Sequence, residues 1–206
     1  MKVIRIIRAM VALCAILMLG AAAAQPLSPS NPPATSSLSA LSGCPALLQH
    51  TMPRLQDEKP VPLCQFSGQV VVVVNTASQC GYTPQYKSLE ALYDRYRQRG
   101  LVVLGFPSND FGGQEPANNA AIADFCENQF AVRFPMFAKT SVKGGTRSTT
   151  NPLFAGLATR SGQSPKWNFH KYIVSRQGDV VLSHGSDTDP LDAAFLRDVE
   201  RLLSSK

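Results

Sequence analysis

Cysteine is the residue type in this 206-residue sequence with the clearest capacity for covalent chemistry, and one of the five cysteines has a distinctive position. Cys80 follows a run of apolar, β-branched residues at 70–75 and precedes Thr83 and Pro84, a pair typical of a helix start. Near a helix N-terminus, unpaired N–H groups and the positive end of the dipole favour the thiolate, the reactive form of cysteine. The alternative is a buried cysteine that packs as a small hydrophobic residue, and position alone leaves both interpretations open.

The other four cysteines lie in different settings. Cys14 lies in an apolar N-terminal run, and Cys126 lies on the apolar face of an expected helix, where the pattern indicates a core residue. Two free thiols seldom persist in an exported protein, so a structural disulfide is the default expectation for Cys44 and Cys64, although the sequence does not prove the pairing. No Cys-x-x-Cys pair occurs and the three histidines are not spaced as metal ligands, so we expect neither a metal nor another cofactor.

The elements that must position these cysteines follow an α/β pattern. The helix that starts at Thr83 and Pro84 ends at Gly100, so residues 70–106 are expected to form a strand–helix–strand unit with parallel strands. The expected strands are residues 70–75, 101–106, 139–142, 172–175 and 180–183, the last two joined by a hairpin turn at 176–179. The other expected helices start at Asn118 or Asn119, at Pro152 and at Asp189-Pro190, the last with Leu191, Phe195, Val199 and Leu202 along one face.

Residues 1–24 have the features of a cleaved signal peptide. A charged start (Lys2, Arg5 and Arg8) precedes a short apolar run, and small residues precede the expected cleavage after Ala24. A membrane anchor is the alternative, but the uncharged run is shorter than the roughly 20 residues that a membrane-spanning helix needs. We therefore expect a periplasmic or secreted protein with no stable membrane anchor after cleavage.

Residues 25–42 are rich in Pro and Ser and show no apolar period, so we expect a flexible linker there, followed by one domain at 43–206. A segment that resembles a lipid-attachment site ends at Cys44, but the linker separates it from the apolar run, so a lipid anchor is not expected. The formal net charge is +6, and three of the positive charges belong to the expected signal peptide. The rest of the chain has no basic stripe with interleaved aromatic residues, which argues against a nucleic-acid partner.

Three segments resemble motifs of the glutathione peroxidase family. Residues 75–83 (NTASQCGYT) resemble its nucleophile segment, residues 104–116 (LGFPSNDFGGQEP) its second signature, and Trp167-Asn168-Phe169 its third. The resemblance implies a thioredoxin-like fold of the α/β class, in which helices flank a mixed central sheet. It also implies that Cys80 is the peroxidatic nucleophile and that Gln114, Trp167 and Asn168 complete a catalytic tetrad as hydrogen-bond donors. Without the resemblance, Trp167 would be interpreted as a lone core tryptophan.

The resemblance also changes the interpretation of Cys126, which lies 46 residues after Cys80. The thioredoxin-dependent, two-cysteine branch of the family has its resolving cysteine there. Cys126 would attack the sulfenic acid of Cys80 to form an intramolecular disulfide, and its helix would have to unwind in part. The substrate would be hydrogen peroxide or an organic or lipid hydroperoxide, and the reductant a thioredoxin-like protein or a small thiol. The short segment between Phe154 and Trp167 implies a monomer with an open active site.

Two other functions would use the same cysteine. A redox relay or peroxide sensor would pass the Cys80–Cys126 disulfide to a partner protein and would differ from an enzyme only in turnover. A cysteine hydrolase would need a histidine paired with Cys80, and His170 is the candidate near a motif. One departure from the family pattern bears on all three functions, because Asp110 replaces a glutamine that is usual there. Its negative charge would raise the pKa of Cys80 if the two side chains lay close together.

Overall fold

A computed structural model of the chain describes residues 43–144 and 149–205. The expected signal peptide at 1–24 and the expected linker at 25–42 lie outside these residues. Within the described part of the chain, no helix has the length and apolar character needed to cross a membrane.

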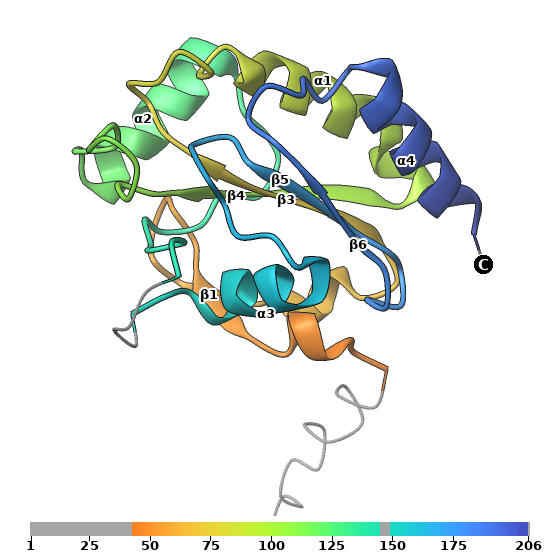
Figure 1. Ribbon diagram of the computed structural model, residues 1–206. Coiled ribbons are helices and arrows are strands. Elements are labelled where there is room, and N and C mark those ends of the chain that lie inside the picture. Colours follow the sequence, from red (N-terminus) through yellow and green to blue (C-terminus); the bar gives the residue numbers. More distant parts are fainter. Residues whose placement is uncertain (1–42, 145–148, 206) are drawn as a thin grey trace, which may run out of the picture. The chain divides into compact units, whose positions relative to one another are not determined.

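A four-stranded mixed sheet forms the centre of the domain, in the order β4-β3-β5-β6 (Figure 1). Its strands are β3 (Val70–Thr76), β4 (Leu101–Pro107), β5 (Lys171–Val174) and β6 (Val181–His184). β3 pairs with β4 in parallel and with β5 antiparallel, and β5 and β6 form the expected antiparallel hairpin. Every residue of β3, β4 and β5 is buried, which is why these strands are nearly continuous apolar runs in the sequence.

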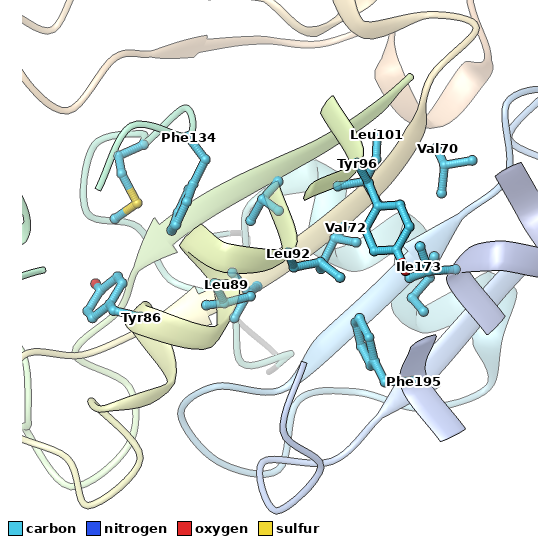
Figure 2. Close-up of a cluster of buried hydrophobic side chains, with 14 of the residues drawn as sticks. Val70, Val72, Tyr86, Leu89, Leu92, Tyr96, Leu101, Phe134, Ile173 and Phe195 are labelled. Atoms are coloured by element: carbon cyan, nitrogen blue, oxygen red, sulfur yellow. The ribbon is translucent and has the colours of Figure 1, made fainter. Parts of the chain in front are cut away.

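The two faces of the sheet carry separate hydrophobic clusters, because successive side chains of a strand point to opposite faces. One cluster takes alternate valines of β3, beginning at Val70, and the other takes those that begin at Val71. Helices α1 (Gln85–Tyr96), α2 (Asn119–Phe130) and α4 (Ala193–Ser204) contribute to the first cluster, which Figure 2 shows in part. Helix α3 (Pro152–Ser161) contributes to the second. This arrangement of helices on both faces of a mixed sheet is the expected fold class.

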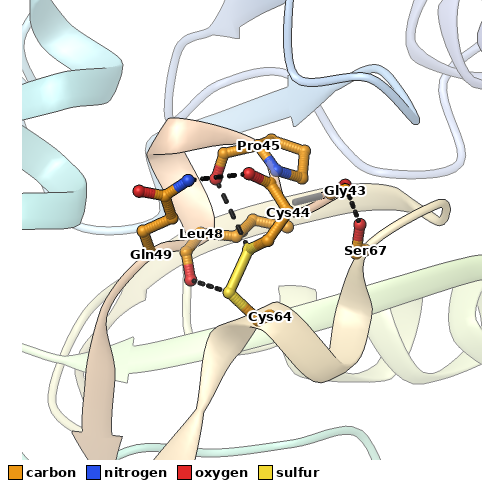
Figure 3. The surroundings of a disulfide bond; sticks show 7 residues. All are labelled: Gly43, Cys44, Pro45, Leu48, Gln49, Cys64 and Ser67. Carbon is orange, nitrogen blue, oxygen red and sulfur yellow. Dashed lines mark hydrogen bonds between the residues drawn. A yellow bond between two sulfur atoms is a disulfide. The ribbon is translucent and has the colours of Figure 1, made fainter. Parts of the chain in front are cut away.

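The N-terminal part of the domain contains a hairpin that the sequence analysis did not predict. Strand β1 (Thr51–Pro53) pairs antiparallel with β2 (Pro60–Pro62), and the short 3-10 helices η2 (Ala46–Leu48) and η3 (Leu63–Phe66) lie on either side of the hairpin in the chain. The expected disulfide joins Cys44 to Cys64, with the two Cα atoms 5.4 Å apart. Figure 3 shows the hydrogen bonds around it, including one from Gln49 Nε2 to the Cys44 carbonyl at 2.9 Å.

Two expected elements differ in the structure. Residues 139–142 form no strand; a single bridge pairs Ser141 with Thr150. The last helix begins at Ala193, after Asp192, rather than at Asp189-Pro190. The carboxylate of Asp189 instead accepts hydrogen bonds from the Ser88 hydroxyl and the Leu191 N–H. Leu191 therefore lies outside the apolar face of α4 and is 41% exposed.

The remaining helix boundaries follow the sequence signals closely. Asn118 is the N-cap of α2, where its Oδ1 accepts from Ala121 N–H at 2.9 Å. A short 3-10 helix, η4 (Arg97–Arg99), continues α1 and ends at Gly100. Gly100 has φ +88°, a conformation that glycine adopts without the steric cost that a side chain brings. It allows the chain to turn directly into β4.

Candidate active site

The topology of the sheet brings three motif segments to one edge. Cys80 follows the end of β3 and Gln114 follows the end of β4, and parallel strands end at the same edge of a sheet. Trp167 and Asn168 precede β5, which is antiparallel to β3 and therefore starts at that edge. Segments nearly 90 residues apart in the sequence are thus placed side by side by strand pairing alone.

Cys80 lies in the turn between β3 and α1, and its side chain is half-buried. The backbone N–H of Tyr82 donates a hydrogen bond to Cys80 Sγ at 3.5 Å. The sulfur also packs against the edge of the cluster formed by α1, α2 and α4. Cys80 is thus a partly exposed residue whose sulfur accepts one backbone hydrogen bond.

Thr83 has a different role from the one the sequence predicted. The Thr83 side chain, expected to cap α1, makes no hydrogen bond to that helix, whose N-cap position is occupied by Pro84. Instead, the buried Thr83 hydroxyl accepts from the Cys80 N–H at 3.1 Å and donates to the Ala77 carbonyl at 2.9 Å. It therefore fixes the backbone of the cysteine turn rather than the start of the helix.

Gln114 reaches the site through two successive glycines. Gly112 and Gly113 both have φ +65°, in the left-handed region that favours glycine. A methyl group at Gly112 would lie 3.4 Å from both Gln114 Cγ and Trp167 Cη2, so the loop passes closely between these side chains. The Gln79 N–H donates to the Gln114 carbonyl at 3.0 Å, which joins this loop directly to the cysteine turn.

Asn168 and Trp167 complete the group on the third segment. Asn168 is fully buried, and its Nδ2 donates to Gln114 Oε1 at 2.9 Å and to the Phe111 carbonyl at 3.4 Å. The Trp167 ring lies against Phe111, with ring centroids 5.9 Å apart, and the Trp167 residue is 39% exposed. The structure therefore brings Gln114, Trp167 and Asn168 together. Among the described residues, none of the three donates a hydrogen bond to the Cys80 sulfur, whose donor is Tyr82 N–H.

Cys126 lies on α2 with 3% of its surface exposed, in the cluster against which Cys80 packs. Burial raises the pKa of the Cys126 thiol to about 11. The negative charge of Glu115 adds to this rise, and the nearby Tyr86 hydroxyl opposes it. Cys126 is thus a protonated core thiol in this conformation, as its position on the apolar face predicted.

Glu115 is a buried carboxylate beside Gln114 that the sequence analysis did not single out. Its Oε2 accepts from the Ser78 hydroxyl at 3.0 Å, and its backbone N–H donates to Asn109 Oδ1 at 2.8 Å. Burial raises its pKa. The only sequence signal was an acidic residue directly after a motif glutamine, and such a residue is ordinarily exposed. Glu115 forms a second link, through Ser78, between the Gln114 loop and the cysteine turn.

Two residues that the sequence placed near the site have other partners. The Asp110 carboxylate accepts from the backbone N–H groups of Val142 and Lys143, at 2.6 and 2.8 Å. It stabilises that segment. His170 Nε2 lies 2.9 Å from the Ser183 hydroxyl, and burial lowers the pKa of His170 to about 4. No hydrogen bond in the described structure joins His170 to Cys80, so the cysteine–histidine pair of a hydrolase is not formed.

A cleft of about 480 Å³ lies beside the exposed face of Trp167. Its lining is polar and apolar in similar measure and combines residues from the cysteine turn, the segment before β5 and the loop after β6. The residues are Tyr82, Gln163, Lys166, Trp167, His170, Gly185, Ser186 and Asp187. Across the described residues, no group of three or more His, Cys, Asp or Glu side chains is arranged to hold a metal ion.

The fold and these loops define a thioredoxin-like domain with a cysteine in the turn between a buried strand and the following helix. Residues 48–157 match the glutathione peroxidase family. The chain is 46% identical over 157 residues to hydroperoxy fatty acid reductase gpx1 of Synechocystis sp., covering 71% of this chain and 90% of that protein. It is 42% identical over 150 residues to glutathione peroxidase-like peroxiredoxin HYR1 of Saccharomyces cerevisiae, covering 70% and 89%. The crystal structure of Trgpx in its apo form superposes with a TM-score of 0.61 at 32% identity, covering 77% of this chain and 95% of that chain.

The chain therefore belongs to the glutathione peroxidase family. This membership confirms the expectation, drawn from the three motifs, of a thiol peroxidase that reduces hydroperoxides. The superposition confirms the thioredoxin-like fold.

Proposed function

We propose that Cys80 carries out the peroxidase reaction as a thiolate nucleophile. Its sulfur attacks one oxygen of the hydroperoxide, a sulfur–oxygen bond forms as the oxygen–oxygen bond breaks, and the alcohol or water leaves after taking a proton. The observation that carries this proposal is the pair of hydrogen bonds, Gln79 to Gln114 and Asn168 to Gln114, which joins the other two motif segments to the cysteine turn.

The three motif side chains take different roles in this proposal. Asn168 Nδ2 donates a hydrogen bond to Gln114 Oε1. This bond orients the Gln114 amide group and leaves its N–H donors for other partners. Those donors and the indole N–H of Trp167 would stabilise the negative charge on the sulfur and on the departing oxygen. Asn168 itself acts on Gln114 rather than on the thiolate.

Cys126 is proposed as the resolving cysteine. Its sulfur attacks the sulfenic acid of Cys80, a disulfide forms, and the hydroxyl leaves with the proton of the Cys126 thiol as water. A thiol with a pKa of about 11 is ionised in only about one molecule in ten thousand at pH 7. Opening of α2 would hydrate the thiol, remove the cause of its raised pKa and bring it to Cys80.

An external thiol then reduces the Cys80–Cys126 disulfide. The yeast relative is named a peroxiredoxin, which supports a thioredoxin-like protein or a small thiol as the reductant. The cyanobacterial relative is named a hydroperoxy fatty acid reductase, and the cleft beside Trp167 is open to solvent. Both observations support lipid and other organic hydroperoxides as substrates beside hydrogen peroxide. We propose a monomeric enzyme on the separate ground that the segment between Phe154 and Trp167 is short.

Disulfide mapping by mass spectrometry tests this cycle. One equivalent of hydrogen peroxide is added to the prereduced protein and, in parallel, to a Cys126→Ser variant. We expect a Cys80–Cys126 disulfide in the wild type, and sulfenic or over-oxidised Cys80 in the variant. Any Cys44–Cys64 disulfide is counted separately in both proteins, because prereduction also opens this bond and peroxide can form it again. A Cys80 that remains a thiol while peroxide persists would refute the proposal.

Export to the periplasm or the exterior is a further part of the proposal. A disulfide away from the reactive cysteines is typical of proteins in oxidising compartments, and Cys44–Cys64 supports export on that ground. N-terminal sequencing of the protein recovered from cell fractions tests it. A mature chain beginning at residue 25 in the periplasm or medium is expected, and an intact N-terminus in the cytosolic fraction would contradict the proposal.

A further inference from the structure

Asn75 is a fully buried polar residue next to the last position of β3, and it makes three hydrogen bonds to the segment that carries Trp167 and Asn168. Its side-chain Nδ2 donates to the Trp167 carbonyl at 3.1 Å. Its carbonyl accepts from the Phe169 N–H at 2.6 Å, and its own N–H donates to the His170 carbonyl at 3.4 Å. One residue of the strand that leads to Cys80 thus holds most of the turn before β5.

The side-chain bond has a particular geometric effect. The Trp167 carbonyl and the Asn168 N–H belong to the same planar peptide unit. A bond from Asn75 Nδ2 to that carbonyl fixes the orientation of the plane, and with it the directions in which the two neighbouring side chains leave the backbone. Trp167 and Asn168 are therefore oriented together by one amide group.

The turn needs such a restraint, because it contains a strained residue. Phe169 has φ +60°, a backbone conformation that is uncommon and strained for a residue with a large side chain. Phe169 is fully buried, and its ring meets Tyr86 edge to face with centroids 5.4 Å apart. Packing at Phe169 and hydrogen bonding at Asn75 hold the conformation from both sides.

We propose that Asn75 is a positioning residue of the peroxidase, which sets Trp167 and Asn168 relative to Cys80 without contacting substrate. This rests on the proposed function for the roles of those three residues. Through Asn168, the effect extends to Gln114, whose Oε1 accepts the Asn168 amide. A misplacement of about 1 Å at a reacting geometry is enough to slow a reaction by about a hundredfold, so loss of this restraint should be visible in the rate.

The chemistry of the contact requires a donor. Alanine would leave the Trp167 carbonyl without this partner, and aspartate would keep the size while placing an acceptor against an acceptor. The adjacent Thr76 offers a matched control, because it is also fully buried on β3 and its hydroxyl has no partner among the described residues. Thr76→Val changes a buried polar atom on the same strand without removing a hydrogen bond.

The test combines a rate with a spectroscopic signal. Trp167 is the single tryptophan of the sequence, so quenching of protein fluorescence by acrylamide reports on that side chain alone. We expect Asn75→Ala and Asn75→Asp to remain folded by circular dichroism and to lose about tenfold or more in the single-turnover rate with hydrogen peroxide. Acrylamide quenching of Trp167 should change by about 1.5-fold or more in both variants. Thr76→Val should stay within about twofold of the wild type in rate and leave the quenching unchanged.

Three results would overturn the proposal: wild-type rates in both Asn75 variants, a rate loss with unchanged Trp167 quenching, or failure of both variants to fold. The last result would make Asn75 a residue required for folding rather than for positioning. A wild-type protein that does not consume peroxide would instead refute the proposed function. The change in Trp167 quenching would still report on Asn75 in that case.

Discussion

Removal of the Cys44–Cys64 disulfide should destabilise the domain without affecting peroxide reduction. The bond joins residues 20 positions apart and closes a loop that contains the β1–β2 hairpin. In the chain-entropy treatment, a closed loop of that length restricts the unfolded state enough to contribute about 3 kcal/mol to stability. For a domain of this size, each kcal/mol corresponds to about 2–4 °C in Tm, so the loss should be about 10 °C.

Thermal unfolding of Cys44→Ala/Cys64→Ala provides the measurement. Both the variant and its reference carry Cys80→Ser, so that no second disulfide forms on heating. Reduction of the reference protein with dithiothreitol should lower its Tm to the same value, which separates loss of the cross-link from any packing defect of the alanines. The catalytic rate, measured with Cys80 restored, should stay within about twofold because Cys44 and Cys64 pack in the hydrophobic cluster on one face of the sheet and Cys80 packs against the cluster on the other face. A stability loss below about 1 kcal/mol would refute the loop-closure reasoning.

Two further changes test single contacts. Thr83→Val keeps the side-chain volume but leaves the Cys80 N–H and the Ala77 carbonyl without their partner, so urea unfolding should show a loss of about 2 kcal/mol and stopped-flow kinetics a slower oxidation of Cys80. Wild-type values for both would contradict the role of this hydroxyl. Lys171 is fully buried, donates to Gln85 Oε1 at 2.8 Å, and has its pKa lowered by burial to about 8. Between pH 8 and the higher pKa that Lys171 has in the unfolded chain, the unfolded state binds more protons than the folded state. The free energy of unfolding of the wild type should therefore rise with pH relative to that of Lys171→Met, by on the order of 3 kcal/mol at most. The free energy of unfolding is measured in urea for both proteins at pH 7 and pH 10. An equal change between the two pH values in both proteins would show that the burial of Lys171 does not shift its pKa.

The buried strands and most helix boundaries could be predicted because their signals are local. A run of β-branched residues that ends near Asn75 is typical of a strand buried on both faces, and Asn118 is a strong N-cap wherever a helix follows it. The β1–β2 hairpin was missed because β2 consists of Pro60, Val61 and Pro62. Two prolines in three residues remove the backbone donors by which a strand is ordinarily expected to pair.

The less predictable contacts join polar side chains to segments distant in the sequence. Thr83 precedes a proline and a helix, which is the local signature of a cap, yet its hydroxyl bonds to Cys80 and Ala77. Asp189 has the same signature before α4 and bonds to Ser88 on α1 instead. A short polar side chain can satisfy its own helix or a neighbouring loop, and only the tertiary structure decides between them.

The two cysteines proposed for the cycle lie in parts of the fold with different capacities to open. The cysteine turn is tied by hydrogen bonds to the Gln114 loop and is followed by α1, which buries six of its twelve residues. Helix α2 has the same length but buries only Ile122 and Cys126. Local opening is least costly where few apolar side chains are withdrawn from the core, so α2 is the helix of this pair that should open first. The fold therefore supports a cycle in which Cys80 stays fixed in its hydrogen-bonded turn and Cys126 moves to meet it.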